Sequence, residues 1–184
     1  MKKVSFTEMK HGSKEDYLLL DKYEKEYIAG TADRIIKFLE NYNQTLEGYK
    51  ISRLEHSLQA ATRALRDNAS DEMVVATLLH DIGDDIAPLN HSEYAAAVLK
   101  PYVSEKTYWI LLKHGEFQAY YYAHHFGKDR NKRDQYKGHK YYDDCVKFCE
   151  NWDQSSFDPN YKSLSLKDFE PLIQKIFSRK PYTS

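Results

Sequence analysis

The sequence predicts an all-α protein folded as a single domain of seven to nine helices. Apolar residues recur at helical spacing through most of the chain, and the strict alternation that is typical of strands is scarce. Residues that favour helix N-termini precede several of these runs. With 184 residues, one domain spanning 1–184 is the default, and the chain is long enough to bury a real core.

Two helices are expected within residues 13–43, before Gly48 breaks the pattern. The segment Ser13-Lys14-Glu15-Asp16 resembles a capping box and opens a run rich in leucine and tyrosine. Thr31 is expected to cap the second helix.

Further helices are expected through the middle of the chain. The run that follows Ser104 reaches His114, and residues 117–126 are expected to continue it as a helix. The expected helix starts are the capping box Ser52-Arg53-Leu54-Glu55, then Ser70, then Asn90 or His91, and then Ser104.

Residues 127–140 have the sequence GKDRNKRDQYKGHK, with six basic residues against two acidic ones, and are expected to form a polar loop. Two interpretations stay open: a solvated loop, or a flap that meets an anionic substrate. A helix containing Cys145 and Trp152 comes next. Asp168 is expected to cap a C-terminal helix over residues 168–178, because Pro171 is tolerated in a first turn.

Charge and hydropathy argue against several classes of partner. The chain has 27 basic and 28 acidic residues, a balance that argues against a nucleic-acid partner. No apolar stretch approaches the roughly 20 residues that a membrane span needs. The opening stretch has no apolar signal region, and the two cysteines are expected to be reduced, so a cytoplasmic location is expected. Both a monomer and a homodimer fit these features.

The segment LLHDIGDD, residues 78–85, ends a run from Met73 that is apolar almost all round. A helix of this kind is normally buried. It ends by placing His80 and Asp81 side by side at the edge of the core. Burying an unpaired carboxylate costs about as much as the net stability of a domain. We therefore expect a bound metal ion to compensate the charge.

Four histidines lie at or beside the ends of apolar helices, and a second aspartate follows Trp152 in CENWDQS. One such histidine alone is more often a hydrogen-bonded core residue than a ligand. Several imidazoles with two carboxylates suit iron, manganese or zinc. Six ligands are too many for one catalytic metal with an open position, so we expect two metals bridged by Asp81. The expected ligands are His56, His80, Asp81, His91, His114 and Asp153.

The order His, His-Asp, Asp, formed by His56, His80-Asp81 and Asp153, resembles that of the HD superfamily of helical metal enzymes. The local sequence HDIG is a common form there, and His91 and His114 match its two-metal branches. The resemblance covers about residues 45–155. It implies a helical bundle around a dinuclear metal site, with the N-terminal helices and the C-terminal helix packed on it.

Two branches of that superfamily compete. The closer resemblance is to the mixed-valent diiron oxygenases, which include the 2-amino-1-hydroxyethylphosphonate oxygenases and, more distantly, myo-inositol oxygenase. The segments LEHSLQ, LLHDIG and HSEYAA and the Trp152-Asp153 pair carry it. The other branch is the metal-dependent phosphohydrolases, which act on nucleotides and other phosphoesters. Asp84 and Asp85 would repel a phosphate if they face the site, but they could equally end the helix in water. A non-catalytic protein that keeps metal for stability is a third interpretation.

The substrate contacts of the phosphonate oxygenases are not retained. Gln118 stands where that family has a phosphonate-binding lysine, Glu150 where it has an arginine, and Tyr49 where it has a glutamate. The resemblance therefore implies a substrate other than a phosphonate. An anionic substrate would be a carboxylate gripped by one of two loop arginines. The expected substrate-binding residues are Tyr49, Gln118, Tyr121, Arg130 and Arg133.

The resemblance implies a reaction in which O2 oxidises or cleaves a small hydroxylated organic molecule. Its cofactor would be two iron ions in the mixed-valent Fe(II)/Fe(III) state. His80 and Asp81 would be the catalytic residues. If the chain is instead a phosphohydrolase, manganese, zinc or nickel would take the place of iron.

Overall fold

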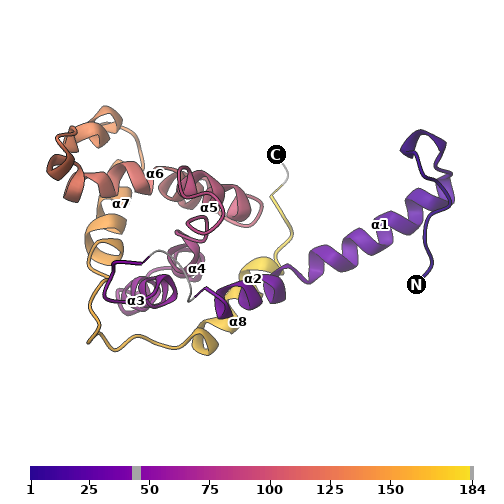
Figure 1. Cartoon of the computed structure of the whole chain (residues 1–184), viewed down its shortest axis with the longest axis horizontal. Coiled ribbons are helices and arrows are strands. Elements are labelled where there is room, and N and C mark those ends of the chain that lie inside the picture. The colour runs from indigo at the N-terminus through magenta and orange to yellow at the C-terminus, as the bar shows by residue number, and fades with distance from the viewer. Residues whose placement is uncertain (43–46, 183–184) are drawn as a thin grey trace.

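The computed structural model describes residues 1–42 and 47–182, and this part of the chain contains helices and no strand (Figure 1). The all-α prediction is confirmed. The described helices are α1 (Lys14–Ala29), α2 (Thr31–Glu40), α3 (Arg53–Arg66), α4 (Asp71–Leu79), α5 (His91–Leu99), α6 (Glu105–Tyr122), α7 (Tyr142–Lys147) and α8 (Leu166–Phe177). Four short helices are η1 (Met9–His11), η2 (Ala123–Phe126), η3 (Arg130–Tyr136) and the π-helix η4 (Phe148–Asp153).

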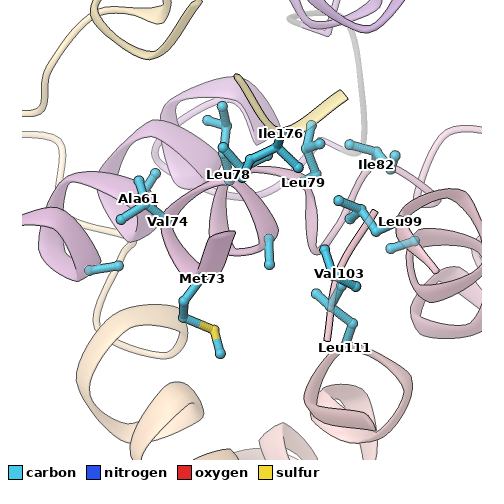
Figure 2. Close-up of a cluster of buried hydrophobic side chains, with 14 of the residues drawn as sticks. Ala61, Met73, Val74, Leu78, Leu79, Ile82, Leu99, Val103, Leu111 and Ile176 are labelled. Carbon is cyan, nitrogen blue, oxygen red and sulfur yellow. The ribbon is translucent and has the colours of Figure 1, made fainter. Parts of the chain in front are cut away.

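Helix α4 forms the centre of the core. Every residue of it from Met73 to Leu79 is buried, and the helix packs against α3, α6 and α8. Burying one large aliphatic side chain contributes about 1.5–3 kcal/mol, so this helix is fixed by its packing on several sides. Figure 2 shows the cluster around it, which includes Ala61, Val74, Leu78, Leu79, Ile82, Leu99, Leu111 and Ile176.

Several helices begin where the sequence indicates. Ser13 with Asp16, and Ser52 with Glu55, form reciprocal capping boxes. The hydroxyls of Ser70 and Ser104 accept hydrogen bonds from the backbone of α4 and α6. These contacts satisfy N–H groups that a helix N-terminus leaves without partners, which explains why local sequence locates them.

Two helix starts differ from the expectation. Gly30, not Thr31, precedes α2, and the Thr31 hydroxyl instead donates to the carbonyl of Ile28. Helix α8 begins at Leu166, because Ser165 and Asp168 form a capping box in which Asp168 lies inside the first turn. Helix α6 continues through His114 to Tyr122 and is followed directly by η2, which agrees with the expected helical continuation.

Residues 127–140 are more ordered than a solvated loop. They contain η3, which packs on α6. The hydroxyl of Tyr136 donates to Glu116 at 3.0 Å, and the ring of His139 stacks on Trp109 at 4.1 Å. The high charge of the segment favoured a loop in the sequence analysis and gave no indication of these aromatic contacts.

Residues 1–29 form an arm that extends away from the rest of the protein (Figure 1). Helix α2 and the C-terminal helix α8 pack on each other, and α8 also packs on α4. The expected boundary between the N-terminal helices and the metal core, at residues 43–45, lies outside the described residues. None of the described helices is long and apolar enough to cross a membrane.

Candidate metal centre

Helix α4 delivers His80 and Asp81 to one end of the core. His80 follows the last residue of α4, and its Nδ1 lies 2.7 Å from the carbonyl of Thr77. The backbone carbonyl of Asp81 accepts a hydrogen bond from the hydroxyl of Tyr42, which follows α2 and is fully buried. Both side chains of the His-Asp pair are buried.

Four side chains meet in a first group, which we call the tetrad: His56, His80, Asp81 and Asp153. The Nε2 atom of His56 lies 3.2 Å from Nε2 of His80, 3.4 Å from Oδ2 of Asp81 and 3.5 Å from Oδ1 of Asp153. Nε2 of His80 lies 3.4 Å from the same two oxygens. Two ligands bound at about 2.1 Å lie about 3.0–3.4 Å apart around an octahedral or tetrahedral ion, so the distances among His56, His80 and Asp81 fit one metal, and Asp153 lies near both imidazoles.

A second group, the triad, consists of Asp81, His91 and His114. The other carboxylate oxygen of Asp81, Oδ1, lies 3.3 Å from Nε2 of His114 and 3.6 Å from Nε2 of His91. The three ligand atoms lie within metal-binding range of one another. The Asp81 carboxylate thus presents one oxygen to the tetrad and the other to the triad.

The orientation of three histidines suits metal binding when their imidazoles are neutral. The Nδ1 atoms of His56, His80 and His114 face backbone carbonyls at 2.9, 2.7 and 2.6 Å. A carbonyl only accepts, so each Nδ1 carries the hydrogen and each Nε2 presents a lone pair. Nε2 of His91 and Oδ2 of Asp153 are buried without a hydrogen-bond partner among the described residues. Lone pairs converging with two carboxylates fit metal ions.

A π-helix places Asp153. Helix η4 ends at Asp153, whose side chain is fully buried. Three residues further on, Ser156 supplies the carbonyl that orients His56. A π-turn is uncommon and often occurs at functional sites.

Close backbone packing places His91. A side chain on Gly83 would meet the Cα of His91 at 2.7 Å, and one on Gly115 would meet Ser92 Oγ at 2.7 Å. These two glycines therefore let the start of α5 approach both the HDIG turn and α6. Nδ1 of His91 lies 3.3 Å from Oδ1 of Asp84, a carboxylate suited to orient a metal-binding imidazole.

A family model described as the HD domain matches residues 53–156, more than half of the chain. The chain belongs to the HD-domain family. HD domains are typically metal-dependent enzymes, and the tetrad and triad together form a His/Asp group that can hold metal, which we call the HD cluster. No curated protein matches the chain.

Arg53 contacts the HD cluster, and this residue was not predicted from the sequence. Its buried guanidinium donates to Oδ2 of Asp81 at 2.6 Å and also to Asp84. Asp84 therefore neither faces a substrate as a free anion nor ends the helix in water, whereas Asp85 is exposed. The spacing of the two residues could have predicted this contact, because Arg53 precedes His56 by three residues and therefore lies on the same face of the helix.

A cavity of about 540 Å³ lies beside the HD cluster. Gln118 links the two, because its amide donates to Oδ1 of Asp153 at 2.7 Å. Phe157 also lines the cavity, and its ring stacks on both His56 and Tyr49. Three of the expected substrate-binding residues line this cavity, and four lining residues were not expected. The lining consists of Tyr49, Gln118, Tyr121, Tyr122, Phe126, Gln154 and Phe157, and none of these is charged.

The structure does not bring Arg130 and Arg133 into this lining. Both guanidinium groups pack on the ring of Tyr120, at 4.0 and 3.6 Å from its centroid. Burial raises the pKa of the Tyr121 hydroxyl, and the nearby Arg133 partly offsets this rise. The contacts of the two arginines with Tyr120 stabilise η3 on α6 through cation–π packing.

The charged groups of the HD cluster stabilise one another's ionised forms. Burial raises the pKa of the Asp81 carboxyl, but the neighbouring imidazoles and Arg53 outweigh burial and hold that pKa well below its usual range. Burial disfavours the protonated form of His56, yet the carboxylates of Asp153 and Asp81 raise the pKa of its imidazole to about 9. In the absence of metal, a proton on His56 therefore takes part of the role of a cation.

The metal-free protein is expected to lose up to about 3 kcal/mol of stability as the pH rises from about 6.5 to about 9. The pKa of the His56 imidazole rises from its ordinary value of 6.5 in the unfolded chain to about 9 in the fold. Its proton thus stabilises the fold below the first value, and this contribution disappears as the pH passes the second. A bound metal replaces the proton, so the metal-loaded protein should keep its Tm. Thermal unfolding with EDTA and with excess metal checks this, and a metal-free Tm that rises over the interval would contradict it.

Proposed function

We propose that this HD-domain chain is a non-haem diiron oxygenase that uses O2 to oxidise or cleave a small hydroxylated organic substrate. The observation that carries the proposal is the division of the Asp81 carboxylate between the tetrad and the triad. Such a carboxylate would be suited to be shared by two metal ions, one held with the tetrad and one with the triad. Imidazole and carboxylate donors together suit iron. When bound, a mixed-valent iron pair would supply the redox chemistry that O2 requires.

The residues around the HD cluster would hold the ligands and the substrate in place. Asp84 orients His91, and Gln118 orients Asp153 while also presenting its amide to the cavity. The stacked rings of Tyr49 and Phe157 shield His56 from water on the cavity side. Fixed ligands and a shielded cavity favour a reaction on one positioned carbon.

The cavity supports a small organic substrate. Its lining offers aromatic rings, tyrosine hydroxyls and two amides, a set that binds hydroxylated molecules by stacking and hydrogen bonding. No cation is present among the described lining residues, and this favours a neutral or positively charged substrate.

A metal-dependent phosphohydrolase is the second candidate, and Arg53 is the observation that favours it. Its guanidinium lies against Asp81, and its Nε is buried without a partner among the described residues. A guanidinium so near a metal site is suited to contact a phosphate oxygen. In that case manganese, zinc or nickel would be bound, with a nucleotide or other phosphoester as substrate.

Metal analysis and EPR of protein purified without oxygen from iron-fed cells distinguish these functions. We expect two irons per chain, a signal from an antiferromagnetically coupled mixed-valent pair, and O2 consumption with hydroxylated substrates. Another metal with hydrolysis of phosphoesters would establish the phosphohydrolase. Bound metal with neither activity would establish a non-catalytic HD domain.

A further inference from the structure

The N-terminal arm, residues 1–29, has its own internal structure. The backbone N–H of Ser5 donates to Asp16 at 2.9 Å, and the hydroxyl of Tyr23 donates to the carbonyl of Lys2 at 3.2 Å. The ring of Phe6 stacks on Tyr17. The first residues thus fold back along α1, and the arm is an ordered unit.

Contacts between the end of α1 and the start of α2 fix the direction of the arm, and we call this junction the root of the arm. Arg34 donates to the carbonyl of Tyr27 at 2.7 Å and to the hydroxyl of Thr31 at 3.0 Å, and its guanidinium covers the ring of Tyr27 at 3.7 Å. Thr31 in turn donates to the carbonyl of Ile28. These contacts tie the end of α1 to the start of α2. The arm is therefore held away from its own body, as Figure 1 shows.

The arm exposes apolar side chains that an isolated helix cannot bury. Tyr27 is 67% exposed, Ile28 45% and Leu20 39%. Leu20, Tyr23 and Tyr27 follow one another at spacings of three and four residues and so form one stripe along α1. The folded-back N-terminal segment covers part of this stripe, through the contact of Tyr23 with Lys2. A single helix of 16 residues is marginal in water. Burial of the stripe against a second apolar surface would stabilise the helix.

A matching surface lies on the same chain, at the root of the arm. It is a groove of about 200 Å³ between α2, α5 and the turn after Asp81, which we call the arm groove. Its lining residues are Thr31, Arg34, Ile35, Phe38, Ile82, Tyr94 and Val98. The contacts of Arg34 and Thr31 with the end of α1 hold the arm away from this groove. The arm of one chain therefore cannot fill the groove of the same chain.

We propose that two copies of the chain form a dimer in which the arm of each copy lies in the arm groove of the other. The stripe and the arm groove meet at residues 27–34. A two-fold axis through this region would therefore place the arm of each copy against the arm groove of the other. Leu20 lies about 15 Å along α1 from Gly30, and Phe38 lies about 12 Å along α2 from the same glycine, at 1.5 Å per residue. The exchange therefore brings the stripe opposite the groove.

The size of the exchanged surface suits a weak but specific dimer. A helix of 16 residues is about 24 Å long and about 10 Å wide. Two arms and two grooves together bury roughly 1,000 Å² by this measure, which is close to the lower limit for a specific interface. The same patch serves both copies, as in most homodimers.

Light scattering after size exclusion tests the dimer. The expected mass of the full chain is about 43 kDa, twice its 21.7 kDa. Leu20→Glu in the stripe and Val98→Glu in the groove should each reduce it to the monomer mass. Leu18→Glu is the matched control and should stay dimeric, because Leu18 lies two residues from Leu20 and off the stripe, although it is 59% exposed. Circular dichroism checks that each variant folds.

Disulfide cross-linking tests the arrangement. The native cysteines Cys145 and Cys149 are buried and should not react. A mixture of Leu20→Cys and Phe38→Cys chains is expected to form a covalent heterodimer, with little cross-linking in either chain alone. Dominant cross-linking of Leu20→Cys chains to each other would show that arms pair with arms and would overturn the proposal. A monomeric wild-type protein at high micromolar concentration, or a dimer that survives Val98→Glu, would also overturn it.

Discussion

Replacing Asp81 by asparagine is expected to remove bound metal and abolish activity. Each oxygen of the Asp81 carboxylate faces a different set of imidazoles, so one substitution removes the shared anion from both proposed metal positions. An amide is a weaker ligand and presents only one oxygen. The metal content should fall from two ions to one or none, and the Tm of protein in excess metal should fall with it.

The same substitution is also expected to destabilise the metal-free protein, because Asp81 is paired with the buried guanidinium of Arg53. Breaking a buried ion pair costs about 3–5 kcal/mol. Asp85→Asn is the matched control, since Asp85 is exposed and lies outside the HD cluster. Metal analysis, activity and thermal unfolding of both variants measure these effects. Unchanged metal content and Tm in metal-loaded Asp81→Asn would refute the bridging role.

The phosphonate 2-amino-1-hydroxyethylphosphonate is expected to be a poor substrate. The described residues that line the cavity include no lysine or arginine. One ion pair at about 4 Å and an effective dielectric near 20 is worth about 4 kcal/mol, so its absence lowers affinity by up to about a thousandfold. Oxygen consumption with the phosphonate should be far slower than with neutral or cationic hydroxylated amines. Rapid turnover of the phosphonate by the wild-type protein would contradict this.

A cation placed in the cavity should reverse this preference. Gln118→Lys puts an ammonium group on the lining beside Asp153, and kcat/KM for the phosphonate is expected to rise at least about tenfold relative to the wild type. Gln135→Lys is the matched control, because Gln135 is exposed on η3 and does not line this cavity. An equal gain in both variants would indicate a general charge effect.

Most of the helices and the candidate metal ligands could be predicted from local sequence. The capping boxes at Ser13 and Ser52 act within four residues, so their spacing alone locates the starts of α1 and α3. The apolar run of α4 predicts burial wherever the helix packs. Each of the six expected ligands lies at or beside an apolar helix. The structure gathers five of them in two groups that could hold metal and places Asp153 beside His56 and His80.

Where two local signals compete, the sequence was less informative. Thr31 and Ser165 are both good capping residues by type, but only Ser165 has an acidic residue three positions later that bonds back to it. The charge of residues 127–140 indicates a loop, while their contacts through Tyr136 and His139 fold them onto α6. In both cases a few specific contacts outweigh average composition.

The sequence by itself determined an all-α HD domain with a set of histidines and aspartates suited to metal, because helix periodicity and capping act over short distances. Only the tertiary structure decided which faces meet. It paired Arg53 with Asp81 and Asp84, and it joined Tyr49, Gln118 and Phe157 around one cavity. It also left Leu20 and Tyr27 of the α1 stripe largely exposed near a groove of the same chain. Spacing along a helix gives the direction of a side chain, but its partner comes from a segment whose position depends on the packing of the whole chain.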